Sequence, residues 1–302
     1  MAFTSAAFPA GCLQHVWRVL RHQDGGKSSK EEGKGGMKTA LTVAGADPTG
    51  GAGLQADLAV FRSFGVYGIS VVSAITAQNT IGVDAIFPVD RGTLERQVRV
   101  LLSDIRPDAV KVGMLFSMWA VDLLAEILEE NEYRQVIVDP VTVSSSGMSL
   151  VEEGALERIR SRLFPLSRVI TPNIYEASVI TGIMVDEANG MKEAAQSLKA
   201  MGPDIVVITG GHLEGKAVDL FFDGSFHFVE GEKMVGEYHG TGCAFASAVT
   251  ALLALDYTPI EAIRRAKGFV RDAMKKAHHP GRGMGILNYS AGAATVQSHV
   301  SG

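Results

Sequence analysis

From Lys38 onward the chain alternates short apolar runs with longer segments whose apolar residues recur every three to four positions. The short runs are typical of buried strands, and the longer repeats are typical of helices that pack one face on a sheet. A chain that alternates strands with helices joins its strands by crossovers, which makes most neighbouring strands parallel. The pattern therefore predicts an α/β fold with a mostly parallel central sheet.

The expected elements follow one another without an internal repeat or a linker, which predicts a single domain over residues 37–288. Asp223-Gly224 lies between the last two expected strands and is typical of a tight hairpin turn. We expect strands at 39–44, 69–75, 85–89, 109–114, 135–139, 169–170, 205–208, 218–222 and 226–229. We expect helices beginning near 54, 94, 119 and 174, and two more at 242–255 and 258–278.

The two ends of the chain differ from this pattern. Residues 1–36 end in a polar, Gly-rich stretch that cannot build a core, so we expect a disordered or non-native extension with Met37 as the natural start. Residues 1–22 contain arginines and no acidic residue, so an organellar presequence is the alternative for this segment. Residues 289–302 are small and polar, which predicts a loose tail.

Composition argues against several classes of protein. The formal net charge is −5 and no stretch clusters Lys and Arg with aromatic residues, so we expect no nucleic-acid partner. No apolar run approaches the roughly 20 residues of a membrane-spanning helix, so we expect no membrane partner either. Cys12 and Cys243 are the only cysteines, too few for a disulfide framework, which favours a reducing compartment and a cytoplasmic protein.

The stretch Gly240-Thr241-Gly242-Cys243 precedes a run of small and apolar residues. Glycines on both sides of Thr241 predict a tight turn that opens onto a helix, whose free N–H groups would bind an anion. Cys243 would stand where a helix N-terminus favours the thiolate. An anion site beside a proton acceptor indicates phosphoryl transfer. The alternative is that the glycines only allow close packing and that Cys243 is a buried apolar residue.

The loop over residues 45–53 joins the first expected strand to the first helix, and its end matches a dinucleotide-binding pattern. The loop is long for that pattern, and no acidic residue between Leu58 and Val83 is available for a ribose hydroxyl, so dinucleotide binding is disfavoured. We expect instead that the glycines admit a substrate to the backbone while Asp57 directs its carboxylate at it. The alternative is a solvated helical Asp57.

Asn173 and Glu176 lie three positions apart at the expected start of a helix, and so on one face of it. An amide and a carboxylate are oxygen ligands that suit Mg²⁺, so the pair is a candidate to hold a Mg²⁺-bound phosphate through water. Asp139, at the carboxyl end of an expected strand, is a further candidate oxygen ligand. The alternative for Asn173 is an ordinary helix cap.

Six short motifs are spread along the chain: AGADPTGGAGLQAD at 44–57, TAQNT at 76–80, KVGM at 111–114, DPV at 139–141, TPNIYEA at 171–177 and GTGC at 240–243. Together and in this order they closely resemble the motifs of the hydroxymethylpyrimidine/phosphomethylpyrimidine kinases of thiamine biosynthesis, in the ribokinase-like superfamily. The resemblance covers roughly residues 37–288. Six linked motifs are far more specific than any one of them.

The resemblance implies a three-layer α/β/α ribokinase-like fold. It also implies an enzyme that uses ATP and Mg²⁺ to phosphorylate 4-amino-5-hydroxymethyl-2-methylpyrimidine, called hydroxymethylpyrimidine below, and then its monophosphate. By matching motif positions, the pyrimidine site would comprise Gly45, Asp57, Gln78, Met114 and Val141, and the anion hole with its base would comprise Gly240, Thr241, Gly242 and Cys243. The ATP site would comprise Thr209, Gly210, Gly211 and Lys267, and the metal site Asn173, Glu176 and Asp139.

Two segments depart from the pattern of this family. Thr209 stands where many relatives have Lys, and residues 281–288 lack the histidines that are common there, so the departures concern the nucleotide contacts. Pyridoxal kinase is the first alternative, because some vitamin B6 kinases share the fold and a similar GTGC. A ligand sensor without turnover is the second, although it would not need Cys243, Asn173 and Glu176. We expect a small-molecule substrate and a homodimer.

Overall fold

The structure is a computed structural model and describes residues 36–144, 147–211 and 217–290. The expectations for the two ends of the chain therefore lie outside the described residues, apart from Gly36, Tyr289 and Ser290. The described residues from Met37 on belong to one compact unit. Tyr289 is buried, so the packed fold reaches at least one residue beyond the expected end of the domain at 288.

Within the part of the chain that the structure describes, nine strands form one sheet in the order β3-β2-β1-β4-β5-β6-β7-β8-β9. The strands from β2 to β7 in this order are parallel, whereas β3, β8 and β9 are antiparallel to their neighbours. The prediction of a mostly parallel sheet is therefore confirmed. The strands are β1 (Thr39–Ala46), β2 (Tyr67–Gln78), β3 (Val83–Pro88), β4 (Ala109–Val112), β5 (Val136–Val138), β6 (Val169–Ile170), β7 (Ile205–Ile208), β8 (Ala217–Phe222) and β9 (Phe226–Gly231).

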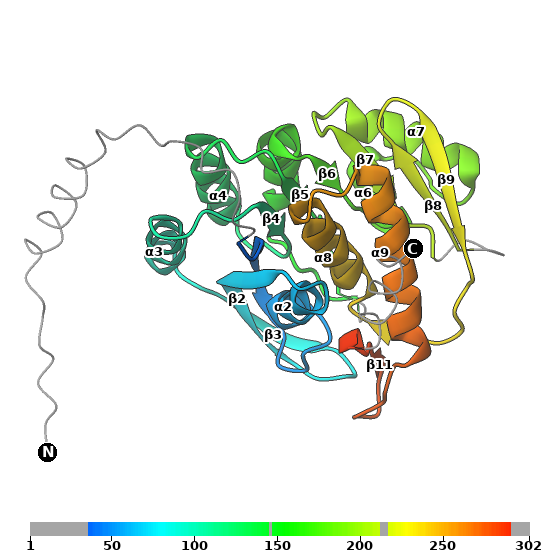
Figure 1. Cartoon of the computed structure of the whole chain (residues 1–302), viewed down its shortest axis with the longest axis horizontal. Coiled ribbons are helices and arrows are strands. Elements are labelled where there is room, and N and C mark those ends of the chain that lie inside the picture. Colours follow the sequence, from blue (N-terminus) through cyan, green and yellow to red (C-terminus); the bar gives the residue numbers. More distant parts are fainter. Residues whose placement is uncertain (1–35, 145–146, 212–216, 291–302) are drawn as a thin grey trace, which may run out of the picture. The chain divides into compact units, whose positions relative to one another are not determined.

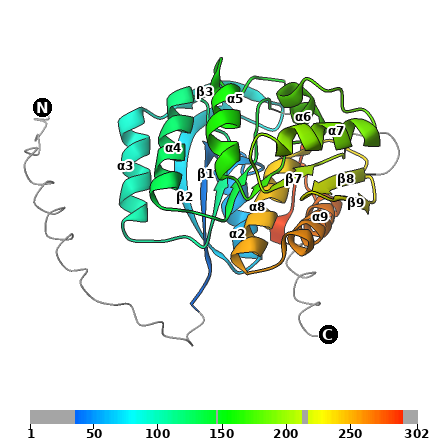
Figure 2. The ribbon, with the colours of Figure 1, turned by 90° about the horizontal axis from the view of Figure 1, so that it is seen from above.

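Helices cover both faces of this sheet (Figure 1). Seen from above, α2, α8 and α9 lie on one face, and α3 to α7 lie on the other (Figure 2). The predicted three-layer α/β/α fold is thus confirmed. The helices are α2 (Gly53–Ser63), α3 (Arg91–Leu102), α4 (Met118–Glu130), α5 (Ala155–Arg158), α6 (Ile174–Thr181), α7 (Ala188–Lys199), α8 (Thr241–Ala254) and α9 (Pro259–Lys275). Among the described helices, none is both long and apolar enough to cross a membrane.

The central strands are mostly apolar because both of their faces are covered. On β1, Leu41 and Val43 belong to the core shared with α3 and α4, while Ala40 belongs to the core shared with α2, α8 and α9. Successive side chains of a strand point to opposite faces, so a strand between two helical layers needs apolar residues at every position. Thr42 on β1 and Lys111 on β4 depart from this pattern, since both are polar and fully buried.

Some elements give no clear signal in the sequence. The first turn of the helix α7 contains Asn189-Gly190, and this dipeptide is typical of turns. Gly190 is nevertheless suited to its place, because a Cβ there would lie 2.5 Å from the carbonyl oxygen of Met184. The strands β10 (Tyr238–His239) and β11 (Gly285–Ile286) form a separate two-stranded sheet. Strands of two residues are too short to show a period.

Candidate active site

A cavity of about 1430 Å³ opens beyond the carboxyl ends of the parallel strands. The loops that follow parallel strands gather at one edge of the sheet, which is where open α/β sheets bind ligands. Asp57 and Gly210 do not line this cavity. The other sequence-predicted site residues do: Gly45, Gln78, Met114, Asp139, Val141, Asn173, Glu176, Thr209, Gly211, Gly240, Thr241, Gly242, Cys243 and Lys267.

The first turn of α8 borders this cavity. Gly240 precedes the helix with φ +80°, in the left-handed region that favours glycine. Thr241, Gly242 and Cys243 form the first turn, whose backbone N–H groups have no acceptor within the helix. N–H groups of this kind and the positive end of a helix dipole suit the binding of an anion.

Gly240 has no room for a side chain, because a Cβ there would overlap the carbonyl oxygen of Gly51. Gly65 has a similar φ of +73°, but a Cβ there would meet nothing within 4 Å. We therefore expect Gly240→Ala to lower the free energy of unfolding by more than about 2 kcal/mol, against about 1 kcal/mol for Gly65→Ala, where only the left-handed strain acts. Urea unfolding of both variants measures the difference. Equal losses would contradict the tight contact between Gly51 and Gly240.

Cys243 is half-buried in the wall of the cavity. Burial raises the pKa of its thiol to about 12; Lys111 opposes this rise, and the carboxylates of Asp139 and Asp57 add to it. The expectation that the helix N-terminus favours the thiolate is therefore wrong, because desolvation and two nearby carboxylates outweigh the helix dipole. Cys243 is a neutral thiol near pH 7.

Asp57 lies beneath the cavity and does not face it. Its carboxylate accepts hydrogen bonds from Thr42 Oγ1 at 2.6 Å and from Ser247 Oγ at 2.6 Å, and it forms a 2.8 Å ion pair with Lys111 Nζ. The side chains of Asp57 and Lys111 are both fully buried. The expectation that Asp57 contacts the substrate is wrong, because three donors from β1, β4 and α8 surround its carboxylate. Those donors are far apart in the sequence, so spacing alone did not reveal them.

Breaking this buried ion pair should destabilise the fold strongly. Asp57→Asn leaves the ammonium group of Lys111 buried without its nearest counter-charge, so we expect the free energy of unfolding to fall by about 3 kcal/mol. Asp204→Asn is a matched control, because it removes the partner of Arg168 from a pair whose side chains are 39% and 60% exposed. We expect less than about 1 kcal/mol there. Similar losses in chemical denaturation would contradict a structural role for Asp57.

Asp139 borders both the cavity and this buried network. Its Oδ2 lies 3.9 Å from Lys111 Nζ and has no hydrogen-bond partner among the described residues. Burial raises the pKa of Asp139, against the opposing effect of Lys111. A buried carboxylate oxygen without a partner is unfavourable, so this atom is suited to meeting a cation or a donor from a ligand.

Asn173 and Glu176 form a capping box at the start of α6. The side chain of Asn173 accepts from the N–H of Glu176 at 2.9 Å, and the carboxylate of Glu176 accepts from the N–H of Asn173 at 2.9 Å. Asn173 is thus a helix cap, the alternative raised by the sequence, and it also lines the cavity. Burial raises the pKa of Glu176 to about 8, and repulsion from Asp139 adds to this. Two carboxyl groups that hinder each other's ionisation favour the arrival of a cation.

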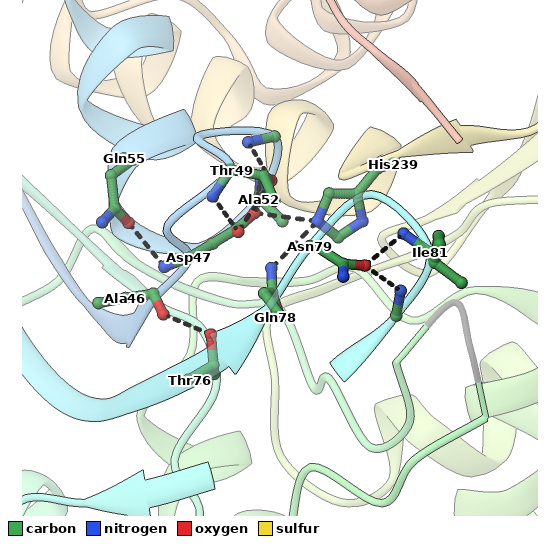
Figure 3. Close-up of polar contacts among 12 residues, drawn as sticks. Ala46, Asp47, Thr49, Ala52, Gln55, Thr76, Gln78, Asn79, Ile81 and His239 are labelled. Atoms are coloured by element: carbon green, nitrogen blue, oxygen red, sulfur yellow. Dashed lines mark hydrogen bonds and ion pairs between the residues drawn. The ribbon is translucent and has the colours of Figure 1, made fainter. Parts of the chain in front are cut away.

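Asp47 joins the β1–α2 loop to the segment before α8 (Figure 3). Its carboxylate accepts from the N–H of Ala52 at 2.7 Å and lies 2.9 Å from Nε2 of His239. Burial alone would raise the pKa of Asp47, but hydrogen bonds from His239 and Thr49 lower it to about 2. The ionised Asp47 therefore fixes the proton of His239 on Nε2. We had assigned no role to Asp47 or His239, although Asp47 lies within a quoted motif and His239 directly precedes Gly240.

Gln78 and a group of apolar side chains shape the same end of the cavity. The amide nitrogen of Gln78 lies 3.4 Å from Nε2 of His239, at the end of β2 (Figure 3). A Cβ on Gly45 would lie 3.0 Å from the sulfur of Met114, so the glycine keeps this wall open. Met114 and Leu150 belong to one apolar cluster, against which Val141 packs. This end of the cavity suits a flat, mostly apolar ring with polar groups on its edge.

The other end of the cavity lies beside α9 and the hairpin of β8 and β9. Lys267 forms a 2.6 Å ion pair with Asp219, whose carboxylate also accepts from the N–H of Gly210 at 3.0 Å. Gly210 is thus buried and its N–H is used internally, so the expectation that Gly210 faces ATP is wrong. Lys267, Thr209 and Gly211 do line the cavity. Asp219, which we had not singled out, sets the position of Lys267.

The chain is similar in sequence to known kinases of thiamine biosynthesis. The family model described as phosphomethylpyrimidine kinase matches residues 47–288. A hydroxymethylpyrimidine/phosphomethylpyrimidine kinase of Bacillus subtilis is 39% identical over 256 residues, which are 83% of this chain and 94% of that protein. A bifunctional thiamine biosynthesis protein of Geobacter sulfurreducens is 44% identical over 262 residues, or 86% of this chain. The chain spans only 54% of that longer protein.

A solved structure extends the comparison to a second activity. The ADP complex of Bacillus subtilis pyridoxal kinase matches with a TM-score of 0.78 and 37% sequence identity, and the match covers 85% of this chain and 98% of that one. This solved structure is of a kinase that is named for pyridoxal and that was crystallised with the nucleotide ADP.

Proposed function

The chain belongs to the phosphomethylpyrimidine kinase family, and we propose that it transfers the γ-phosphoryl group of ATP to hydroxymethylpyrimidine and then to the monophosphate. The observation that carries the proposal is the first turn of α8 with Cys243. It lies in one cavity with Gln78 and Met114 at one end and Thr209 and Lys267 at the other. An anion site between a pocket that fits a flat ring and a pocket that fits a nucleotide suits phosphoryl transfer from the nucleotide to a substrate that carries the ring.

The pyrimidine would occupy the end of the cavity near β2. Met114 and Val141 would pack on the ring, while the amide of Gln78 would pair with the amino group and a ring nitrogen on its edge. His239 lies beside this amide, with its Nε2 3.4 Å from the amide nitrogen of Gln78. The substrate hydroxymethyl group would then face the first turn of α8.

The transferred phosphoryl group would meet the N–H groups of Thr241, Gly242 and Cys243. Phosphoryl transfer passes through a loose transition state, so positioning and charge stabilisation by these N–H groups dominate. Cys243 would take the proton of the substrate hydroxyl. Because a thiol with a pKa near 12 is rarely ionised at neutral pH, its contribution should grow with pH.

Magnesium is the second cofactor that we propose besides ATP. The donor set suits it, because Asp139 has a carboxylate oxygen without a hydrogen bond and Glu176 has a raised pKa, and both line the cavity with Asn173. When bound there, the ion would neutralise charge on the phosphate oxygens. We also propose, from the sequence alone, that the protein is a cytoplasmic homodimer.

Pyridoxal is the competing substrate, because the cavity belongs to a fold shared with a pyridoxal kinase. We expect kcat/KM for hydroxymethylpyrimidine to exceed that for pyridoxal at least tenfold, about 1.4 kcal/mol, since Gln78 offers both a donor and an acceptor to an aminopyrimidine. A coupled assay with hydroxymethylpyrimidine, its phosphate and pyridoxal at equal concentration, with Mg-ATP, measures the ratio. An equal or higher value for pyridoxal would make this protein a pyridoxal kinase.

A further inference from the structure

The segment after α9 returns across three loops at the pyrimidine end of the cavity. The N–H of Met284 donates to the carbonyl oxygen of Thr80 at 2.9 Å, in the turn between β2 and β3. The strand β11 then pairs with β10, directly before the anion-binding turn of α8. Tyr289 follows and contacts the β1–α2 loop. The segment is therefore in contact with three loops that are far apart in the sequence.

Tyr289 makes two hydrogen bonds that attach this segment to the rest of the fold. Its hydroxyl donates to the carbonyl oxygen of Gly51 at 2.7 Å, in a buried position. Its own carbonyl oxygen accepts from Ser63 Oγ at 2.9 Å, at the end of α2. Tyr289 is 8% exposed and belongs to the core shared by α2, α8 and α9. Tyr289 does not line the cavity, so it has no direct contact with a substrate.

The carbonyl of Gly51 links Tyr289 to the reacting groups. It lies so close to Gly240 that no Cβ fits between them. The next residue, Ala52, donates its N–H to Asp47 at 2.7 Å, and the N–H of Gly53 is directed at the thiol of Cys243. Any movement of Gly51 would therefore change the distance between the β1–α2 loop and the first turn of α8.

We propose that Tyr289 is a positioning residue for phosphoryl transfer, whose hydroxyl holds Gly51 and thereby keeps the anion-binding turn of α8 aligned with the β1–α2 loop. The proposal rests on the proposed function of this site. Without the hydroxyl, the Gly51 carbonyl loses its donor in a buried position, which favours a shift of the loop. Displacement of reacting groups by about 1 Å can slow a reaction about a hundredfold, so a smaller shift still has a measurable effect.

Tyr289→Phe tests the proposal, with Ser63→Ala as its matched control. Each variant removes one hydrogen bond of Tyr289, but only Tyr289→Phe frees Gly51. For Tyr289→Phe we expect kcat to fall about tenfold or more while KM for the alcohol and for ATP changes less than about threefold. For Ser63→Ala we expect kcat to stay within about twofold of wild type, because the hydroxyl of Tyr289 still holds Gly51.

A second measurement needs no turnover. The rate at which iodoacetamide alkylates Cys243, followed by peptide mass spectrometry, should rise at least about threefold in Tyr289→Phe and not in Ser63→Ala, because a displaced Gly53 uncovers the thiol. The proposal would be overturned if Tyr289→Phe had the same kcat and the same alkylation rate of Cys243 as the wild type. It would also be overturned if Tyr289→Phe and Ser63→Ala lost kcat and thermal midpoint equally, because Tyr289 would then only hold the segment against the fold.

The two proposals fail in different ways. The kcat values are taken with whichever alcohol the wild type phosphorylates, so a wrong substrate assignment leaves the comparison of variants intact. If the wild type phosphorylated no alcohol, the proposed function would be wrong. The alkylation rates of Cys243 in the two variants would then decide the role of Tyr289 on their own.

Discussion

Cys243→Ala should lower kcat by about 10²–10⁴ and still leave measurable phosphoryl transfer, because a general base adds that factor while the N–H groups of α8 supply the larger part of catalysis. The alanine keeps the backbone of the first turn, so the anion site persists. The measurement is kcat from about pH 6 to about pH 9, a range that lies wholly below the pKa of about 12 of Cys243. Each variant is first shown to be folded and to bind ATP.

The pH dependence separates the thiolate from other effects. Because burial raises the pKa of Cys243 to about 12, the thiolate fraction, and with it kcat of the wild type, should rise with pH across this range. Cys243→Asp should retain more activity than Cys243→Ala, because a carboxylate can also accept the proton. Its slope should be flatter, since the intrinsic pKa of Asp is about 3.9. Wild-type turnover of the alanine variant at every pH would make Cys243 a packing residue.

Glu176→Gln should lower kcat about a thousandfold, with only partial recovery at high Mg²⁺, because it removes one charge from the proposed metal site while keeping the size of the side chain. Glu261→Gln is the matched control. Glu261 takes the same position at the start of α9, where its carboxylate accepts from the N–H of Thr258, but it lies outside the cavity. Loss of the helix cap alone would therefore affect both variants.

Titration of kcat with Mg²⁺ distinguishes the two explanations. The control should follow the wild-type curve, whereas Glu176→Gln should require more Mg²⁺ and reach a lower plateau. Wild-type turnover of Glu176→Gln at low Mg²⁺ would remove Glu176 from the metal site. Equal losses in both variants would assign the effect to capping.

Much of the fold could be predicted because buried strands and buried helix faces appear in the sequence as apolar runs or repeats. The strand around Val43 and the helices around Leu94 and Phe245 carry continuous or periodic apolar residues, which the two helical layers require. The helix α9 also begins at Pro259, one residue after the predicted start at 258. The helix α7 and the strands β10 and β11 depend on close backbone contacts or on pairing with remote segments, which no local pattern records.

The candidate site was less predictable, because the role of a polar residue depends on its neighbours in space. Asp57 matches a family motif, but Lys111 and Ser247 arrive from β4 and α8 and bury its carboxylate. For Cys243 the sequence indicated only the position at a helix N-terminus, whereas burial has the largest effect on the pKa of the thiol. Asp219 and Tyr289 contact Lys267 and Gly51, which lie 48 and 238 positions away in the chain.

The most direct measurement follows the products of the wild-type enzyme by mass spectrometry and ³¹P NMR, with hydroxymethylpyrimidine and excess Mg-ATP. We expect the monophosphate to appear first and to be converted to the diphosphate, with two ADP formed for each pyrimidine consumed. Both transfers would use the same cavity, so Cys243→Ala should slow both. Absence of any phosphorylated pyrimidine, under conditions in which the same enzyme phosphorylates pyridoxal, would contradict the proposed function.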